Sequence, residues 1–399
     1  MHRNVLILAL TQIFAGTAPP VVTMVAGIIG TRLAPNPSLA TLPAALMAVG
    51  LGFNSIPAAL IMGKIGRKAG FLIAFAVATI AIFVLAYAVS INSFLLLCIS
   101  LIFVGGNMSF VSQFRFAAAE SVQPEKVSKA ISLVLVGGIV AAYLGPEIGK
   151  RAIHLVQSAP YVGSFLSLGG LYLVGIVILS FYKNVEAPKE TINAEARPIG
   201  VILKQPGVIV AIAAGAVAFA VMVTIMVATP IQMHVKDGHS MGFVALIIQG
   251  HLLGMYVPSL FTGQLVSRFG VTKMMMAGIV CLITSISFNI SGHEIQNFAV
   301  GLVFLGVGWN FLFISGTTLL TENYTYAERF KTQAANDFIV YTTFATGSLF
   351  SGAMLHFLGW EKLNLIMLVL VAAMIVVLAV YVTKYKNAEP AKSASQTAG

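Results

Sequence analysis

Long apolar stretches recur along almost the whole chain and are separated by short polar segments. A helix needs about 20 mainly apolar residues to cross a bilayer. The stretches reach that length and are continuous instead of alternating, which favours helices over a transmembrane β-barrel. Twelve spans are predicted, at residues 5–29, 41–62, 70–90, 93–118, 129–152, 160–182, 205–229, 241–262, 272–291, 295–320, 332–357 and 361–383.

The composition supports a membrane environment. Hydrophobic residues make up 58% of the chain and charged residues only 9%, whereas a soluble protein of this size carries more charge. The net charge of +10 would suit a nucleic-acid-binding surface. The basic residues, however, are scattered over short loops between apolar stretches. We therefore expect the lipid bilayer, and no nucleic acid, as a partner of this chain.

The basic residues are divided unevenly between the two sets of loops. With both termini placed in the cytoplasm, 18 of the 23 Lys and Arg residues fall on the cytoplasmic side. The positive-inside rule then predicts cytoplasmic termini. The short loops and the lack of an organelle signal favour the cell (inner) membrane of a bacterium.

A short loop motif occurs twice, after the second and after the eighth predicted span. Gly66 of the first copy and Gly270 of the second are 204 positions apart, and a weaker echo links spans 4 and 10 at a similar offset. Membrane proteins built from two like halves usually hold a site between them. The sequence therefore predicts an all-α, polytopic protein with two pseudo-symmetric six-helix bundles. Its parts are expected at 1–182 (first bundle), 183–204 (cytoplasmic linker), 205–384 (second bundle) and 385–399 (disordered tail).

The loop motif resembles that of the major facilitator superfamily, Gly-x-Leu-x-Asp-Arg-x-Gly-Arg-Lys, and the resemblance covers essentially the full chain. Both copies depart from it at the acidic position, where Gly63 and Ser267 stand. The resemblance implies alternating access around a cavity lined by spans 1, 4, 7 and 10. The matching residues that could form a cytoplasmic gate are Lys64, Gly66, Arg67, Lys68, Arg268 and Gly270.

A second motif lies in span 5. Antiporters of this family carry Gly-Pro-x-x-Gly-Gly, and Gly145, Pro146 and Gly149 match it. The match favours export by antiport only slightly, because so short a motif also occurs by chance in a glycine-rich chain.

Polar residues inside spans are candidates for the substrate cavity. A central charge costs about 2.5–3.5 kcal/mol on insertion scales, so such residues need a reason to be there. Small polar side chains also hold helices together, which is the structural alternative for most of them. For Arg115, near the end of span 4, the alternative is a long side chain that reaches the lipid headgroups. Pro19 and Pro20 are expected to interrupt span 1, because proline lacks a backbone N–H. The cavity candidates are Gln12, Thr17, Asn107, Gln113, Arg115, Thr224, His251, Trp309 and Asn310.

Three residues are candidates for proton coupling: His251, Asp337 and Glu147. Histidine titrates near physiological pH, although a neutral imidazole bonded inside the bundle is the alternative. Asp337 could supply the acid that Gly63 lacks, by pairing with Lys64 or Arg67 in a cytoplasmic gate. Glu147 has basic residues three and four positions later, so a local ion pair is its alternative role.

These features predict a secondary active transporter that moves a small organic molecule, with protons as the coupling ion. No enzyme motif, cofactor site or metal-ligand spacing is visible, and we expect a monomer. Proton-symport uptake of a nutrient, metabolite or siderophore is an open alternative. A non-transporting membrane sensor or assembly protein of the same fold is another.

Overall fold

The computed structural model describes residues 2–36, 39, 42–157, 159–185 and 196–386. Residues 186–195 of the predicted linker lie outside the described residues, as does the predicted tail from residue 387. Every regular element among the described residues is a helix, and twelve helical segments are long and apolar enough to cross a membrane. The prediction of an all-α protein with twelve spans is confirmed.

The chain divides into two compact units, and each takes one short segment from the opposite half of the sequence. These segments, Glu125–Ser132 and Gln333–Tyr341, lie near the start of spans 5 and 11, which are counterparts in the sequence repeat. The first unit comprises Met1–Pro124, Leu133–Lys189 and Gln333–Tyr341, and the second comprises Glu125–Ser132, Glu190–Thr332 and Thr342–Gly399.

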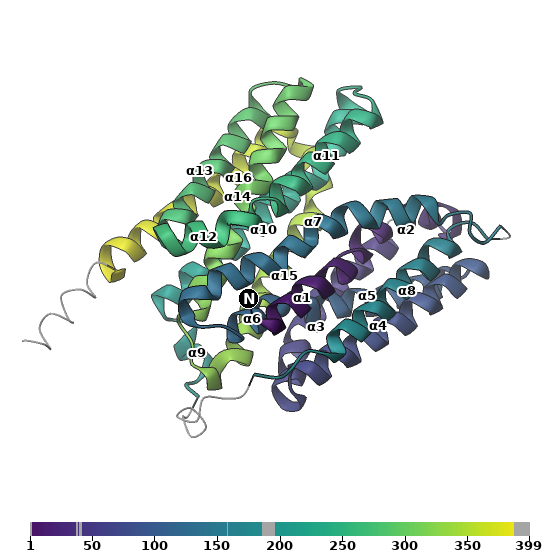
Figure 1. The fold of residues 1–399 in the computed structure, drawn as a ribbon. Helices are drawn as coiled ribbons and strands as arrows, with labels where there is room; N and C mark the ends of the chain where they lie inside the picture. Colours follow the sequence, from purple (N-terminus) through teal and green to yellow (C-terminus); the bar gives the residue numbers. More distant parts are fainter. Residues whose placement is uncertain (1, 37–38, 40–41, 158, 186–195, 387–399) are drawn as a thin grey trace, which may run out of the picture. The chain divides into compact units, whose positions relative to one another are not determined.

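The first unit is built from long helices that pack side by side (Figure 1). The helix α4 (Arg67–Ser90) packs against both α5 (Phe94–Ser112) and α8 (Val162–Ser180), and α3 (Leu42–Ile65) also packs against α5. The other helices that begin in this half of the sequence are α1 (Arg3–Ala15), α2 (Ala18–Leu33), α6 (Phe114–Glu120) and α7 (Val127–Arg151).

The first span is broken at the place where the two prolines predict an interruption. The helix α1 ends at Ala15, and α2 begins at Ala18 with Pro19 and Pro20 in its first turn. Proline is tolerated there because the first N–H groups of a helix have no partner within it. At the break, Thr17 donates its hydroxyl to the carbonyl of Phe14 at 2.6 Å.

Aromatic rings fix the short helix α6 in the first unit. The ring of Phe114 meets that of Phe71 edge to face, with centroids 4.8 Å apart. Phe114 and Phe116 are fully buried. Burial of such a side chain stabilises the fold by about 1.5–3 kcal/mol. These two rings therefore hold α6, and with it the intervening Arg115, in place.

In the second unit, α14 (Ile295–Thr321) packs against α10 (Pro206–Pro230), α11 (Met241–Tyr256) and α13 (Val271–Ile290). A Cβ atom at Gly306 of α14 would lie 2.5 Å from the carbonyl oxygen of His251 in α11. A residue without a side chain is needed there, as is common where transmembrane helices approach closely. The other helices are α9 (Ile199–Ile202), α12 (Ser259–Phe269), α15 (Arg329–Leu358), α16 (Trp360–Tyr381) and a π-helical turn at Ile231–Lys236.

The two repeated glycines have the same backbone conformation. Gly66 between α3 and α4 has φ 85° and ψ 157°, and Gly270 between α12 and α13 has φ 83° and ψ 157°. Essentially only glycine adopts this region. The repeat that is visible in the sequence is thus also present in the geometry of the two loops.

Candidate functional site

A buried ion pair joins Arg115 of α6 to Asp337 of α15 within the first unit. Asp337 is fully buried and Arg115 is 3% exposed. Nη2 of Arg115 contacts Oδ1 of Asp337, and Nη1 donates to the hydroxyl of Tyr341 at 3.0 Å. Two charges that are removed from water need close pairing and further hydrogen bonds. This pair has both.

The second carboxylate oxygen of Asp337 is bonded from the end of α5. Gln113 donates through Nε2 at 2.7 Å, and Ser112 donates its hydroxyl at 3.1 Å. Asn336, the preceding residue, donates to Oδ1 at 2.9 Å. The chain turns at Gln113 between α5 and α6, which brings Ser112, Gln113 and Arg115 to the same carboxylate.

A second buried ion pair lies in the same unit. Arg67, the first residue of α4, binds Glu120 in a bidentate manner, with Nε–Oε2 at 2.8 Å and Nη2–Oε1 at 2.5 Å. Gln333 of α15 accepts a hydrogen bond from Arg67 at 2.7 Å and donates one to Glu120 at 3.1 Å. Bidentate Arg–carboxylate pairs fix geometry as well as charge.

Gln113 links the two ion pairs. Its Oε1 accepts from Nη1 of Arg67 at 3.4 Å, while its Nε2 donates to Asp337. A continuous set of hydrogen bonds therefore runs from Glu120 to Asp337. We call this set the charge network; it consists of Arg67, Ser112, Gln113, Arg115, Glu120, Gln333, Asp337 and Tyr341.

The sequence prediction for the partner of Asp337 was wrong. Lys64 or Arg67 was the expected partner, but Arg115 forms the ion pair, and Arg67 pairs with Glu120 instead. Lys64 is exposed. The reason lies in the break at Gln113, because the separate helix α6 carries Arg115 to the carboxylate. An uninterrupted span 4 does not predict this approach.

Four members of the charge network, Ser112, Glu120, Gln333 and Tyr341, are not among the residues predicted from the sequence. The sequence contained a signal for the last two. Gln333 and Tyr341 lie four residues before and four residues after Asp337. Residues four apart share one face of a helix. Once Asp337 is singled out, this spacing places all three side chains on the same face of α15.

The polar candidates of the second unit serve different local roles. Asn310 is buried and fully engaged, since it donates to the Met255 carbonyl at 2.7 Å and to Ser259 at 2.6 Å and accepts from Thr262. Thr224 is buried in α10, where its carbonyl accepts from the hydroxyl of Ser351 at 2.7 Å.

His251 and Trp309 are also in the second unit, and each keeps a buried nitrogen without a hydrogen-bond partner. Nδ1 of His251 lies 2.9 Å from the carbonyl oxygen of Leu302, so this nitrogen is the donor and the free one is Nε2. For Trp309 the free group is the indole Nε1–H. Buried polar groups nearly always have partners, so these two nitrogens are exceptions, as are the buried hydroxyls of Ser285 and Ser315 in the same unit.

The remaining cavity candidates belong to the first unit. Asn107 is buried in α5 and Thr17 is buried at the α1–α2 break, whereas Gln12 in α1 is half-buried. The structure thus gathers Gln113, Arg115 and Asp337 into one network. His251, Trp309, Asn310 and Thr224 belong to the other unit.

The family model of the Major Facilitator Superfamily matches residues 5–250 and 224–398. This chain belongs to the major facilitator superfamily. It is a multi-pass membrane protein, and the resemblance of its loop motif to that of the superfamily reflects membership.

Individual members of the superfamily are similar over nearly the whole chain. The riboflavin transporter RfnT of Brucella anthropi is 38% identical over 377 residues, which is 94% of each chain. The uncharacterized MFS-type transporter YdeG of Bacillus subtilis is 29% identical over 385 residues, 91% of this chain and 88% of that one.

Solved structures of superfamily members share the fold. The human organic anion transporter MFSD10 (TETRAN) superposes with a TM-score of 0.77 at 12% identity, over 94% of this chain and 99% of that one. The fucose:proton symporter FucP of E. coli gives a TM-score of 0.73 at 15% identity, over 94% and 97% of the two chains. Identities this low show the fold alone.

The two copies of the superfamily loop motif make different contacts. In the second copy, the hydroxyl of Ser267 lies 2.9 Å from that of Ser128 in α7. Arg268 is exposed near the ring of Phe269. In the first copy, the backbone N–H of Lys68 donates to Asn184 at 2.9 Å.

The antiporter-like motif of the superfamily falls in α7. A Cβ atom at Gly145 would lie 2.6 Å from Cγ of Pro20, so close packing against α2 explains this glycine. The surroundings of Pro146 and Gly149 are not among the described features.

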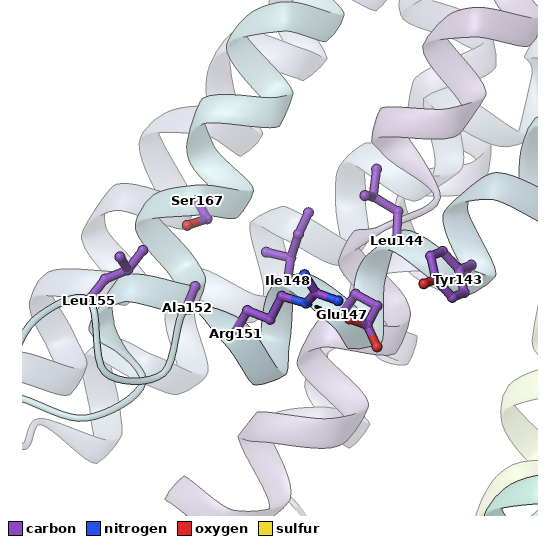
Figure 2. A pocket seen from close by; sticks show the side chains of 8 residues that line it. All are labelled: Tyr143, Leu144, Glu147, Ile148, Arg151, Ala152, Leu155 and Ser167. Carbon is purple, nitrogen blue, oxygen red and sulfur yellow. Dashed lines mark hydrogen bonds and ion pairs between the residues drawn. The ribbon is translucent and has the colours of Figure 1, made fainter.

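Glu147 lies on a solvent-accessible part of the same helix. Its Oε2 accepts from Nε of Arg151 at 2.7 Å, four residues later, as the ion-pair alternative predicts. Figure 2 shows the pair among the residues that line a pocket. The volume of this pocket is about 470 Å³. The lining consists of Tyr143, Leu144, Glu147, Ile148, Arg151, Ala152, Leu155 and Ser167.

Proposed function

We propose that this protein is a secondary active transporter that carries riboflavin, or a flavin closely related to it, across the bacterial cell membrane. The observation that supports this substrate is the 38% identity to the riboflavin transporter RfnT over 94% of both chains. The similarity covers 94% of this chain, so it extends over both halves of the sequence.

We further propose transport into the cell, coupled to protons. Riboflavin carries no net charge at neutral pH, so the membrane potential alone cannot concentrate it. Accumulation therefore needs a second, co-transported species. The close packing of Gly145 against Pro20 accounts for that glycine in structural terms, which weakens the sequence argument for export by antiport.

The charge network is the proposed coupling element, and Asp337 is its proton-accepting group. The carboxylate holds the guanidinium of Arg115 and accepts hydrogen bonds from three further side chains. Protonation of Asp337 would cancel the ion pair and leave Arg115 without its counter-charge. A change of protonation would thus be converted into a change in how α6 and α15 are held together. Alternating access needs such a step.

The test measures uptake of radiolabelled riboflavin by a riboflavin-auxotrophic bacterium that expresses the protein. We expect accumulation above the external concentration, and its loss when an ionophore collapses the proton gradient. The Asp337→Asn variant should be inserted in the membrane but inactive, whereas Glu147→Gln should accumulate riboflavin normally.

Other outcomes distinguish the alternatives. If preloaded cells that express the protein lose riboflavin faster than cells without it, transport runs out of the cell and the proposed direction is wrong. A protein that is correctly inserted but moves no riboflavin in either direction would contradict the proposed substrate. If accumulation survives the ionophore and depends on sodium, the coupling ion is sodium and not the proton.

A further inference from the structure

Five aromatic side chains of the second unit form a contiguous group that the charge network does not involve. Four helices contribute to it, and all five residues belong to this unit. We call the group the aromatic cluster; it consists of Phe219 in α10, Tyr256 in α11, Trp309 and Phe313 in α14, and Phe344 in α15.

The rings of the aromatic cluster present both faces and edges. Trp309 and Phe313 are stacked, with centroids 4.9 Å apart and an interplanar angle of 20°. Phe219 stands perpendicular to both of them, at 5.3 Å from each, and to Phe344 at 5.7 Å. Tyr256 meets Trp309 edge to face at 6.3 Å. Such offset and T-shaped arrangements are the favourable geometries for π systems, and a planar ligand ring can join them.

The five members of the aromatic cluster differ in exposure. Phe219, Trp309 and Phe313 are buried, at 8%, 3% and 4% exposure. Tyr256 and Phe344 are partly exposed. Tyr256, which contacts Trp309, and Phe344, which contacts Phe219, are therefore the members that a ligand ring can reach without displacing buried side chains.

Trp309 has a polar group that its packing does not explain. Its Nε1–H is buried and lacks a hydrogen-bond partner. The indole N–H of a buried tryptophan usually finds an acceptor. The other tryptophan of the chain obeys this rule, since Nε1 of Trp360 donates to the carbonyl of Asn289 at 2.6 Å. An unused donor inside a group of rings suits a ligand that brings both a flat ring and an acceptor atom.

The chemistry of the aromatic cluster defines the class of ligand. None of its five side chains carries a charge at neutral pH, so the cluster suits an uncharged ring and offers nothing to a phosphate or a carboxylate. The isoalloxazine ring of riboflavin is planar and uncharged, and it carries carbonyl oxygens and ring nitrogens as acceptors.

We propose that the aromatic cluster binds the planar ring system of the substrate, with Nε1 of Trp309 donating to a carbonyl oxygen or nitrogen of that ring. This inference rests on the proposed function and adds the part of the protein that recognises the ring. The ribityl chain of riboflavin would then be bound by residues outside the aromatic cluster.

The test is a fluorescence titration of riboflavin with the purified full-length protein. Lumichrome, which has the tricyclic ring without the ribityl chain, should compete with riboflavin, whereas ribitol should not. The Trp309→Phe variant keeps a ring but loses the N–H, and we expect it to bind riboflavin about threefold to tenfold more weakly. Removing a stacking face by Phe313→Leu should weaken binding about tenfold.

Trp360→Phe is the matched control, because it removes an indole N–H that already has a protein partner. Both variants shorten a buried ring and should lower the melting temperature, Trp360→Phe by more because it also leaves the Asn289 carbonyl without its donor. Only Trp309→Phe should lower riboflavin affinity. If the wild type binds riboflavin and Trp309→Phe binds it equally well, the aromatic cluster is not the ring site. If ribitol competes and lumichrome does not, the ring site is again wrong while the proposed function stands. Failure of the wild type to bind riboflavin would overturn the proposed function and this inference with it.

Discussion

The side-chain amide of Gln113 donates to Oδ2 of Asp337 at 2.7 Å, across 224 positions of sequence. The same amide accepts from Arg67 through its oxygen at 3.4 Å. Gln113 therefore lies between two buried ion pairs, Arg67–Glu120 and Arg115–Asp337, and contacts one member of each. A change of charge at Asp337 would alter the bonding of Gln113 and, through it, the environment of Arg67.

Asp337→Asn is expected to impair both stability and transport. The amide keeps the shape of the side chain but leaves the buried guanidinium of Arg115 without a counter-charge, and breaking such a pair costs about 3–5 kcal/mol. The melting temperature of the purified protein and the rate of riboflavin uptake should both fall. Glu147→Gln is the control. Its partner Arg151 is exposed, so the Glu147–Arg151 ion pair contributes at most about 1 kcal/mol to stability.

A double variant separates the structural from the functional contribution. Arg115→Met with Asp337→Leu removes both charges, and apolar residues of similar volume often replace a buried ion pair without loss of stability. We expect the melting temperature to recover only in part, because Ser112, Gln113 and Asn336 lose their acceptor, while uptake stays absent. Recovery of uptake together with stability would show that the pair only holds the fold, and the proposed coupling role of Asp337 would be wrong.

The repeated loop glycines should respond unequally to alanine. Both have φ near 85° and ψ 157°, where a residue with a side chain is strained by about 1–3 kcal/mol. At Gly66 a Cβ atom would also lie 2.7 Å from Nδ2 of Asn184, whereas no atom lies within 4 Å of a Cβ at Gly270. Thermal unfolding should show a larger loss of stability for Gly66→Ala than for Gly270→Ala. Equal losses would mean that Asn184 moves aside without cost.

The fold could be predicted from the sequence because the bilayer imposes a length on each element. Any helix that crosses it must be apolar for about 20 residues, so the spans are visible one by one without knowledge of their neighbours. The recurrence of the Gly66 loop motif at Gly270 then indicates that the two halves of the sequence are repeats of each other. Even the break in span 1 is local, since Pro19 and Pro20 determine it.

The partners within the charge network could not be predicted in this way. The position of Asp337 on α15 follows from sequence, and so does the shared face with Gln333 and Tyr341. Its ion pair does not, because several cations lie close to the ends of spans in the sequence and no local pattern selects one of them. The choice of Arg115 depends on the turn at Gln113 and on the packing of residues 333–341 within the first unit.

The stability of the second unit should depend on pH through His293. Nδ1 of this residue lies 3.1 Å from Asp237 and Nε2 lies 2.8 Å from Glu361. Burial lowers the pKa of His293, but the hydrogen bonds and charges of Asp237 and Glu361 outweigh it, so the pKa is raised above its usual 6.5. The raised pKa means that the imidazolium is favoured in the folded chain.

The sign of the effect follows from that shift. The stabilisation is fully present below pH 6.5, the value for the unfolded chain, and is lost as the pH rises through the higher folded value. Because His293 is 42% exposed, its contribution should be less than about 1 kcal/mol. The melting temperature of His293→Asn should therefore fall below that of the wild type at pH 5.5 and match it at pH 8.5. An equal difference in melting temperature at both pH values would contradict the assignment of His293 to an ion pair. His154→Asn is the control, because His154 is exposed.

His251 provides the last test, because one of its nitrogens has a structural partner and the other has none. Nδ1 donates to the Leu302 carbonyl at 2.9 Å, while Nε2 is buried without a partner. His251→Ala loses both nitrogens and should reduce stability as well as transport. His251→Asn places an amide N–H near the position of Nδ1 and can restore the bond to Leu302, but it cannot titrate.

If protons pass through His251, the Asn variant should regain the melting temperature of the wild type and still show impaired, pH-independent riboflavin uptake. Normal uptake with a normal pH profile would instead assign His251 to the packing of α11 against α14, and Asp337 would remain the one proposed carrier of the proton.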